Sequence, residues 1–266
     1  MGHFTANNLV NNADKAALLY NNKRKADDIT LEVAGESISA KTEEKLLGLQ
    51  ISSSMNWKAH IELLKKKMSQ KLGILRRLKS KIPGSKLEIV AQAFFTSVAR
   101  YGIAVYFKPR LYNDPMCGEQ DKLQVIQNKM FRLLTGTKIE DKVRVEKLAK
   151  DLNQMSMNQM SCYHILVETY NIINFETSMK IRNKLLPNNP HSTRLTVPLF
   201  KKDSCRSFSY YAAKLWNLLP LEIRSNGMPK SGLDKRAEDS RLNSFKTEIK
   251  KWILGTDESP PGVPFR

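Results

Sequence analysis

Two adjacent aspartates, Asp27 and Asp28, are the first candidates for chemistry in this chain. They stand in the stretch YNNKRKADDITLEV, directly before an apolar run typical of a β-strand. Carboxylates at the end of a strand could hold a pair of Mg²⁺ ions about 3.5–4 Å apart, as phosphoryl-transfer enzymes do. The preceding residues are polar and basic, however, and only Asp14 lies upstream as a partner. We therefore interpret the pair as a solvated turn that enters a hairpin.

The other residue types that could carry chemistry are dispersed. The histidines show no paired metal-ligand spacing, and the cysteines are far apart without a C-x-x-C pair. We expect His60 to pack or face solvent, and Cys162 to be a buried thiol. No glycine-rich phosphate loop is present. We predict no catalytic residue, no metal site and no cofactor.

Positive charge is the strongest compositional signal. The chain has 266 residues with 44 Lys and Arg against 26 Asp and Glu, a formal net charge of +18. Residues 57–110 hold 13 basic and two acidic side chains, so they contribute 13 − 2 = +11, and the remaining residues contribute 18 − 11 = +7. Such a concentrated charge favours a polyanionic partner, most simply nucleic acid, with an anionic membrane surface as the weaker alternative.

The basic segment has the pattern of an amphipathic helix over residues 57–82. Apolar side chains recur every three or four residues from Trp57 to Ile82, and Pro83-Gly84 ends the pattern. A helix with a buried stripe and a basic outer face suits phosphate contacts, although a charged face that only keeps the helix solvated is the alternative. The predicted nucleic-acid-binding residues are Lys58, Lys65, Lys66, Lys67, Lys71, Arg76, Arg77 and Lys79.

The remaining pattern predicts a mainly α protein with a small N-terminal β hairpin or sheet, an α+β class. Strands are expected near 29–38 and over 45–51, where Gly48 suggests a bulge or a close backbone approach. Ser85 to Glu88 reads as a capping box that opens a helix. Further helices are expected at 120–135, 141–151 and 157–174. No run of 18 apolar residues occurs, so we expect no membrane span and no membrane partner.

The C-terminal third is expected to form a small helical unit after a proline-rich linker at 185–200. The polar insert 225–241 is expected to be mobile, and the tail 255–266 disordered. The expected core of the unit consists of Phe208, Tyr211, Leu215, Trp216, Phe245, Ile249 and Trp252.

Five blocks along the chain resemble, in the same order, the C-terminal part of the reverse transcriptase encoded by LINE-type (non-LTR) retrotransposons. The first, NNLVNNADKA (7–16), is similar to the family's N-x-L-x-x-N-x-x-K-T segment, with Ala16 in place of the threonine. KLLGLQI followed by MNWKAHI resembles an L-G strand and a W-x-x-H-I helix start. FFTSVARYG and QVIQNKMFRLLTG resemble thumb segments. RSFSYYAAKLWNLLPLEIR followed by NSFKTEIKKWI resembles the end of such reading frames.

The resemblance implies an organisation and a role for each part. Residues 1–55 would be a remnant of the palm, 56–184 a basic thumb-like helical bundle, 185–200 a linker and 201–254 a C-terminal helical unit. Lys15 would fall on the family's lysine near the nucleotide phosphates. The family's catalytic aspartates would lie before residue 7, so Asp27 and Asp28 are on the wrong side.

The functional expectation is a truncated, non-catalytic reverse-transcriptase fragment that binds a template–primer duplex of RNA or DNA without sequence preference. The parent family is an RNA-directed DNA polymerase that uses Mg²⁺. The alternative is a helical protein–protein interaction module with incidental positive charge. The expected location is intracellular, in the nucleus or the cytoplasm.

Overall fold

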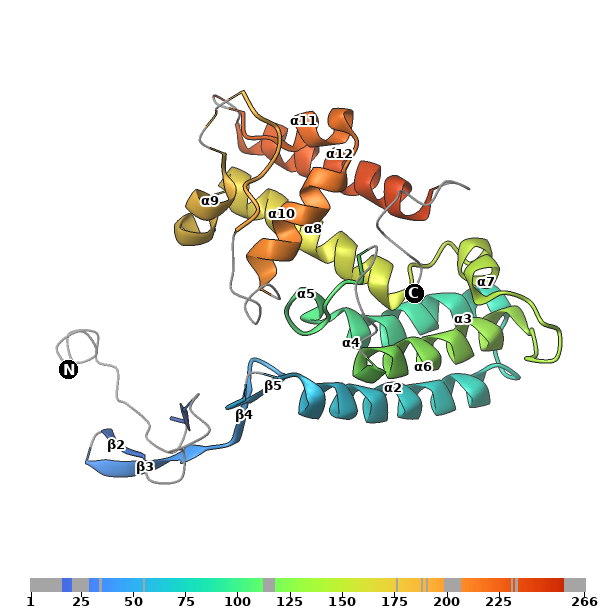
Figure 1. The fold of residues 1–266 in the computed structure, drawn as a ribbon. Coiled ribbons are helices and arrows are strands. Elements are labelled where there is room, and N and C mark those ends of the chain that lie inside the picture. Colours follow the sequence, from blue (N-terminus) through green and yellow to red (C-terminus); the bar gives the residue numbers. More distant parts are fainter. Residues whose placement is uncertain are drawn as a thin grey trace. The chain divides into compact units, whose positions relative to one another are not determined.

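The computed structural model confirms a mainly α protein with a small N-terminal β region (Figure 1). The chain divides into two compact units, residues 1–64 and 65–266, and the division falls inside one helix. Each unit is described by itself below. The structure describes residues 16–20, 29–33, 35–54, 56–111, 118–175, 177–187, 189, 191–198, 207–230, 232 and 234–255.

The first unit contains two small sheets. In one, β1 (Leu18–Leu19) pairs in parallel with β3 (Glu36–Lys41), which pairs antiparallel with β2 (Thr30–Val33). The other is a hairpin of β4 (Glu43–Leu46) and β5 (Leu49–Ser52), with Leu46 opposite Leu49.

The expectation of a single strand over 45–51, with Gly48 marking a bulge or a close backbone approach, was wrong, because the chain reverses there. Leu47 and Gly48 form the two-residue turn of the β4–β5 hairpin, with φ of 46° and 83°. Two successive positive φ values match the twist that tight hairpins require. The apolar leucine in the first turn position concealed this turn, since Asn and Asp are the residues that usually signal it.

The basic segment forms α2 (Lys58–Leu78), close to the predicted helix. Asn56 supports its start, because the side-chain Oδ1 accepts a hydrogen bond of 3.1 Å from the backbone N–H of Lys58. His60 is buried, and its Nδ1 accepts a hydrogen bond of 3.2 Å from the backbone N–H of Gln50 on β5. His60 is therefore a packed side chain that joins α2 to the hairpin within the first unit.

A nearly continuous helical rod follows α2. It consists of α3 (Gly84–Val90), the π-helical segment η3 (Ala91–Thr96) and α4 (Ser97–Arg100), and the short α5 (Ile103–Tyr106) comes after a turn at Gly102. The predicted capping box is absent. Pro83 occupies the N-cap position without a side-chain cap, so Ser85 already lies within the first helical turn and cannot act as the cap.

Three helices complete the middle of the chain: α6 (Gly118–Thr135), α7 (Val145–Asp151) and α8 (Met157–Phe175). Two buried glutamines of α6 fix the turn before α8. Gln124 accepts a 2.8 Å hydrogen bond from Met157 N–H, and Gln127 donates one of 2.9 Å to Met155 C=O. Since α8 buries side chains around most of its circumference, it forms the central helix of the second unit.

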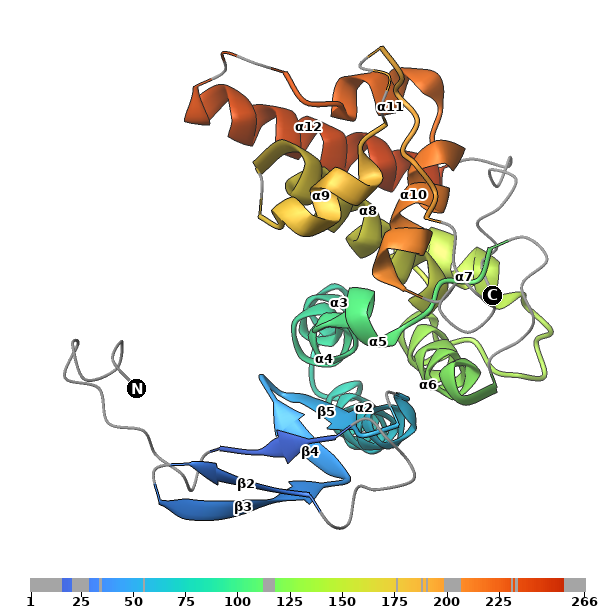
Figure 2. The same cartoon turned by 60° about the vertical axis from the view of Figure 1, so that its left-hand side comes forward.

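Four C-terminal helices pack around α8 (Figures 1 and 2). They are α9 (Met179–Leu185), α10 (Phe208–Leu218), α11 (Leu221–Gly227) and α12 (Lys235–Leu254). The insert expected to be mobile at 225–241 instead contains the end of α11 and the start of α12. Asp234 caps α12 through a 2.8 Å hydrogen bond from Ala237 N–H, which lets this polar sequence begin a helix.

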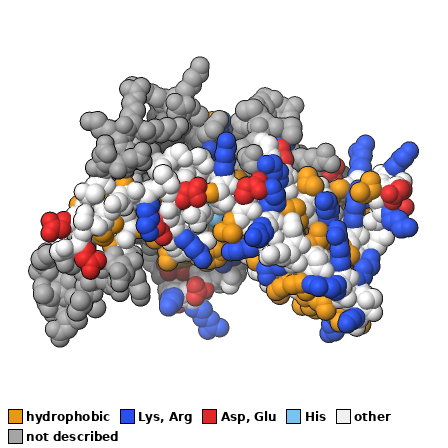
Figure 3. Space-filling view, turned by 90° about the horizontal axis from the view of Figure 1, so that it is seen from below, with side chains coloured by type: hydrophobic (Ala, Val, Ile, Leu, Met, Phe, Trp, Pro, Cys, Tyr) orange, Lys and Arg blue, Asp and Glu red, His pale blue; other side chains and the backbone are white. Residues whose placement is uncertain are grey.

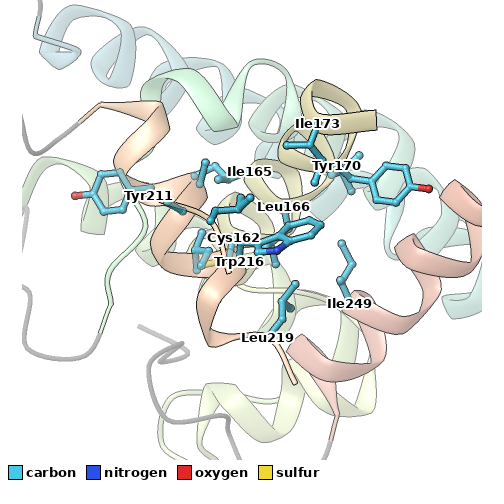
Figure 4. Close-up of a cluster of buried hydrophobic side chains, with 14 of the residues drawn as sticks. Cys162, Ile165, Leu166, Tyr170, Ile173, Tyr211, Trp216, Leu219 and Ile249 are labelled. Atoms are coloured by element: carbon cyan, nitrogen blue, oxygen red, sulfur yellow. The ribbon is translucent and has the colours of Figure 1, made fainter. Parts of the chain in front are cut away.

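Trp216 lies at the centre of the shared core and is fully buried (Figure 4). Its ring lies 5.5 Å from that of Phe245, which stacks at 4.7 Å on Tyr170 of α8. A Cβ added at Gly227 would lie 2.6 Å from the Trp216 ring, so this position of α11 requires glycine. The C-terminal helices therefore share their core with α8.

Of the seven core residues predicted for the C-terminal helices, five are buried and two are half-buried. Phe208 and Trp252 are the half-buried pair and pack against the edge of the core. The buried residues are Tyr211, Leu215, Trp216, Phe245 and Ile249.

The segment 193–195 is hydrogen-bonded to the end of α10, although the composition of residues 185–200 suggested a linker. Asn217 holds Leu195 at both backbone groups, accepting from its N–H at 2.8 Å and donating to its C=O at 2.9 Å. The Trp216 indole N–H donates to Thr193 C=O at 3.1 Å. Leu195 is consequently buried in the core, and this segment forms part of the fold.

Candidate nucleic-acid interface

The α2 helix separates its apolar and basic side chains onto opposite faces. The buried side chains are Ile61, Leu64, Met68, Leu72 and Leu75. At 3.6 residues per turn these positions lie within one stripe, and Lys66 and Arg77 point to the opposite side of the helix. The amphipathic pattern found in the sequence is therefore present in the structure.

The eight predicted binding residues differ in exposure. Lys58, Lys66, Arg76, Arg77 and Lys79 are exposed, and Lys79 lies just beyond the helical bounds. Lys65, Lys67 and Lys71 are half-buried at the edges of the apolar stripe. The exposed five are the stronger candidates for phosphate contacts, since a phosphate must reach the charged head of the side chain.

Lys71 has a structural partner. Its ammonium nitrogen lies 3.4 Å from the ring centroid of Phe94, on η3. A cation over an aromatic face is attracted by the ring, by about 0.5–1 kcal/mol at exposed sites. Lys71 therefore links two helical elements of the second unit, and a phosphate would have to compete with the ring for its charge.

Helix geometry divides the basic residues into three rows. Lys58, Lys65 and Arg76 point in similar directions around the axis of α2. Lys66 and Arg77 form a second row, about a quarter turn further around the axis. Lys67 and Lys71 occupy the far edge. Figure 3 shows a face on which Lys and Arg side chains outnumber acidic ones, with hydrophobic side chains between them. A duplex along the helix can meet the first two rows together, whereas the third faces away.

The outer face of α2 carries one exposed acidic side chain among its described residues, Glu62, which lies between Lys58 and Lys66 around the helix and is outnumbered by the basic side chains. Ion pairs occur elsewhere, at Lys41–Glu44 (2.7 Å) and Arg110–Asp121 (3.4 Å). Within the described part of the chain, no carboxylate forms an ion pair with Lys58, Lys66, Lys67, Arg76, Arg77 or Lys79. Their charges are thus available to an external anion.

Two further exposed lysines continue the basic surface beyond α2. Lys81 lies in the turn after the helix, and Lys86 lies in the first turns of α3. The sequence pattern could have included them, because both belong to the charge-rich range 57–110. Lys81 lies inside the 57–82 pattern and Lys86 just beyond it, but neither is among the eight predicted binding residues.

The sequence also singled out candidate residues outside α2. Lys15, Asp27 and Asp28 lie outside the residues that the structure describes. Cys162 is fully buried as predicted, and burial raises the pKa of its thiol. Within the described residues, no group of three or more His, Cys, Asp or Glu side chains is placed to hold a metal ion.

His164 is half-buried on α8, beside Tyr163. Burial is the main reason that its pKa is lowered to about 4, and the positive charge of Arg100 adds to the effect. The same burial raises the pKa of Tyr163, while Arg100 acts in the opposite direction. The imidazole is therefore neutral near pH 7 and adds no charge to the surface.

Comparison with known proteins gives no further assignment. No protein-family model, curated protein or solved structure matches this chain. None of the described helices combines the length and apolar character needed to cross a membrane.

Proposed function

We propose that this protein binds nucleic acid through the outer face of α2, without preference for sequence. The observation that carries the proposal is the set of exposed, unpaired cations opposite the buried stripe of the helix. The likeness of the sequence blocks to the thumb of LINE-type reverse transcriptases supports a template–primer duplex of RNA and DNA as the ligand.

The chemistry of the face favours contacts to the backbone. Lysine and arginine on a straight helix can reach the phosphates of a duplex lying alongside, and such contacts fix position without reading bases. Reading a base sequence would require side chains that enter a groove and contact base edges. The exposed side chains Lys58, Lys66, Arg76 and Arg77 are long cations, which suit phosphates.

Salt dependence provides the first test. Four phosphate contacts would lower the logarithm of the binding constant by roughly 3.6 per tenfold increase in salt, at about 0.9 per contact. Fluorescence anisotropy with an RNA–DNA hybrid and an unrelated DNA duplex should give similar affinities and similar slopes. An affinity that hardly changes with salt would contradict the proposal and favour the alternative, an apolar surface for a partner protein.

A charge-matched pair of variants locates the site. The test variant carries Lys58→Ala, Lys66→Ala, Arg76→Ala and Arg77→Ala, and we expect its salt slope to fall by about one unit for each residue that contacts phosphate. The control carries Lys235→Ala, Arg236→Ala, Lys250→Ala and Lys251→Ala, which removes four exposed cations from α12. Equal losses in both variants would show that net charge, and not α2, determines binding.

A further inference from the structure

A buried arginine in the C-terminal helices has no acidic partner among the residues that the structure describes. Arg224 of α11 is only 8% exposed. Its Nε donates to Thr193 Oγ1 at 3.1 Å, and its Nη1 donates to the backbone carbonyls of Asn217 and Leu219 at 3.1 and 3.3 Å. These bonds hold the guanidinium plane against the end of α10 and the 193–195 segment.

The bonds of Arg224 leave part of its hydrogen-bonding capacity unused. A guanidinium group has five N–H donors, and the three described bonds involve only Nε and Nη1. The Nη2 group has no hydrogen-bond partner among the described residues. Thr193 Oγ1 accepts from Arg224, so the proton of its own hydroxyl remains available to a second acceptor.

A second guanidinium increases the positive potential at this place. Arg194 is exposed and directly follows Thr193. Burial lowers the pKa of Arg224, and the neighbouring charge of Arg194 lowers it further. A buried charge that lacks a counter-ion is unfavourable, and a second like charge adds to the penalty. A bound anion would relieve both effects.

We propose that Arg224, Arg194 and Thr193 form a phosphate-binding subsite, separate from α2, at the junction of α10, α11 and the 193–195 segment. The Nη2 group of Arg224, which has two unused N–H donors, can donate to the oxygens of a phosphate group. Arg194 supplies a second charge from the solvent side, and the Thr193 hydroxyl donates to a third oxygen. The phosphate belongs either to a nucleic-acid backbone or to a small phosphate ligand.

Calorimetric titration of the full chain with inorganic phosphate, at constant ionic strength, tests the subsite. We expect saturable binding to the wild type, and an affinity lower by about tenfold or more in Arg194→Ala, because hydrogen bonds to charged groups are strong. Arg194 is exposed, so this change should leave the fold intact. Arg224→Lys keeps a positive charge but loses the Nη2 donors, and it should also weaken binding. Lys250→Ala, an exposed cation on α12, is the matched control.

The outcomes separate this subsite from the α2 surface. Phosphate binding that persists in the fourfold α2 variant and is lost in Arg194→Ala supports it. A dinucleotide that competes with phosphate identifies a nucleic-acid backbone as the source, and failure to compete identifies a small phosphate ligand. The absence of saturable binding, or equal affinity in wild type, Arg194→Ala and Arg224→Lys, would overturn the proposal.

Discussion

At the scale of single residues, Thr96 has a buried polar atom without a partner. Its Oγ1 makes no hydrogen bond within the described part of the chain, although the residue is only 3% exposed. Thr96→Val should therefore raise the free energy of unfolding, by about 1 kcal/mol, because it removes an unsatisfied hydroxyl at nearly constant shape. Urea unfolding followed by circular dichroism measures the change.

Thr169 is the matched control for Thr96. It is equally buried, but its hydroxyl donates to Ile165 C=O at 2.6 Å. Thr169→Val should lower the free energy of unfolding by about 0.5–1.5 kcal/mol, since it removes a bond that is made. Equal destabilisation by both changes would mean that the Thr96 hydroxyl is satisfied in solution.

His164 couples stability to pH. Its pKa is about 4 in the folded chain against an ordinary value of 6.5. Between these values the unfolded state binds more protons, so the free energy of unfolding increases as pH rises from about 4 to 6.5 and this contribution is level outside the window. Partial exposure of the side chain reduces the expected gain to about 1–2 kcal/mol.

Substitution of the imidazole tests this coupling. His164→Gln removes the titrating group, and unfolding measured across pH 4–7 should show a shallower rise than in the wild type. The carboxylates titrate in both proteins and cancel in the difference. Parallel curves for the two proteins would show that His164 has the same pKa in the folded and unfolded chain.

At the scale of elements, Asn217 is expected to hold the 193–195 segment in place. Asn217→Ala would leave both the N–H and the C=O of Leu195 without their partner. We expect the free energy of unfolding to fall by about 2–3 kcal/mol, because two buried backbone groups would be left without a hydrogen bond. Faster amide exchange at Leu195 and Thr196 would report the release of the segment. Unchanged amide exchange at Leu195 and Thr196 would show that the two hydrogen bonds do not hold the segment in place.

How well the sequence predicted an element depended on whether the contacts that form the element come from residues close by in the chain. α2 was predicted closely, because its apolar residues repeat with the helical period and Pro83 ends it. The prediction of a linker was wrong for residues 193–195, since their contacts come from Asn217, which lies 22 residues away from Leu195. At the candidate site, periodicity identified the outer face of α2, but the contact between Lys71 and Phe94 could not be read from either helix alone.

At the scale of the whole molecule, Trp216 is expected to control stability well beyond its own helix. Trp216→Ala removes the centre of a core built by α8, α10 and α12, and it should cost about 3–5 kcal/mol. Because the core is shared, amide protection should fall in α8 as well as in the C-terminal helices. Protection lost only after residue 200 would instead support an independent C-terminal unit.

The π-helical segment η3 holds an extra residue in the rod formed by α3, η3 and α4. Within it, Phe95 and Thr96 are buried and the adjacent Phe94 lies against Lys71. A π-helical turn holds one residue more than the corresponding α-helical turn. Deleting one exposed residue there, such as Gln92, would restore a regular α-helix and leave the residues on either side facing as they do now. The same deletion in α3 or α4 would turn everything beyond it by about 100°, so the effect of a change in length along this rod depends on whether it falls inside η3.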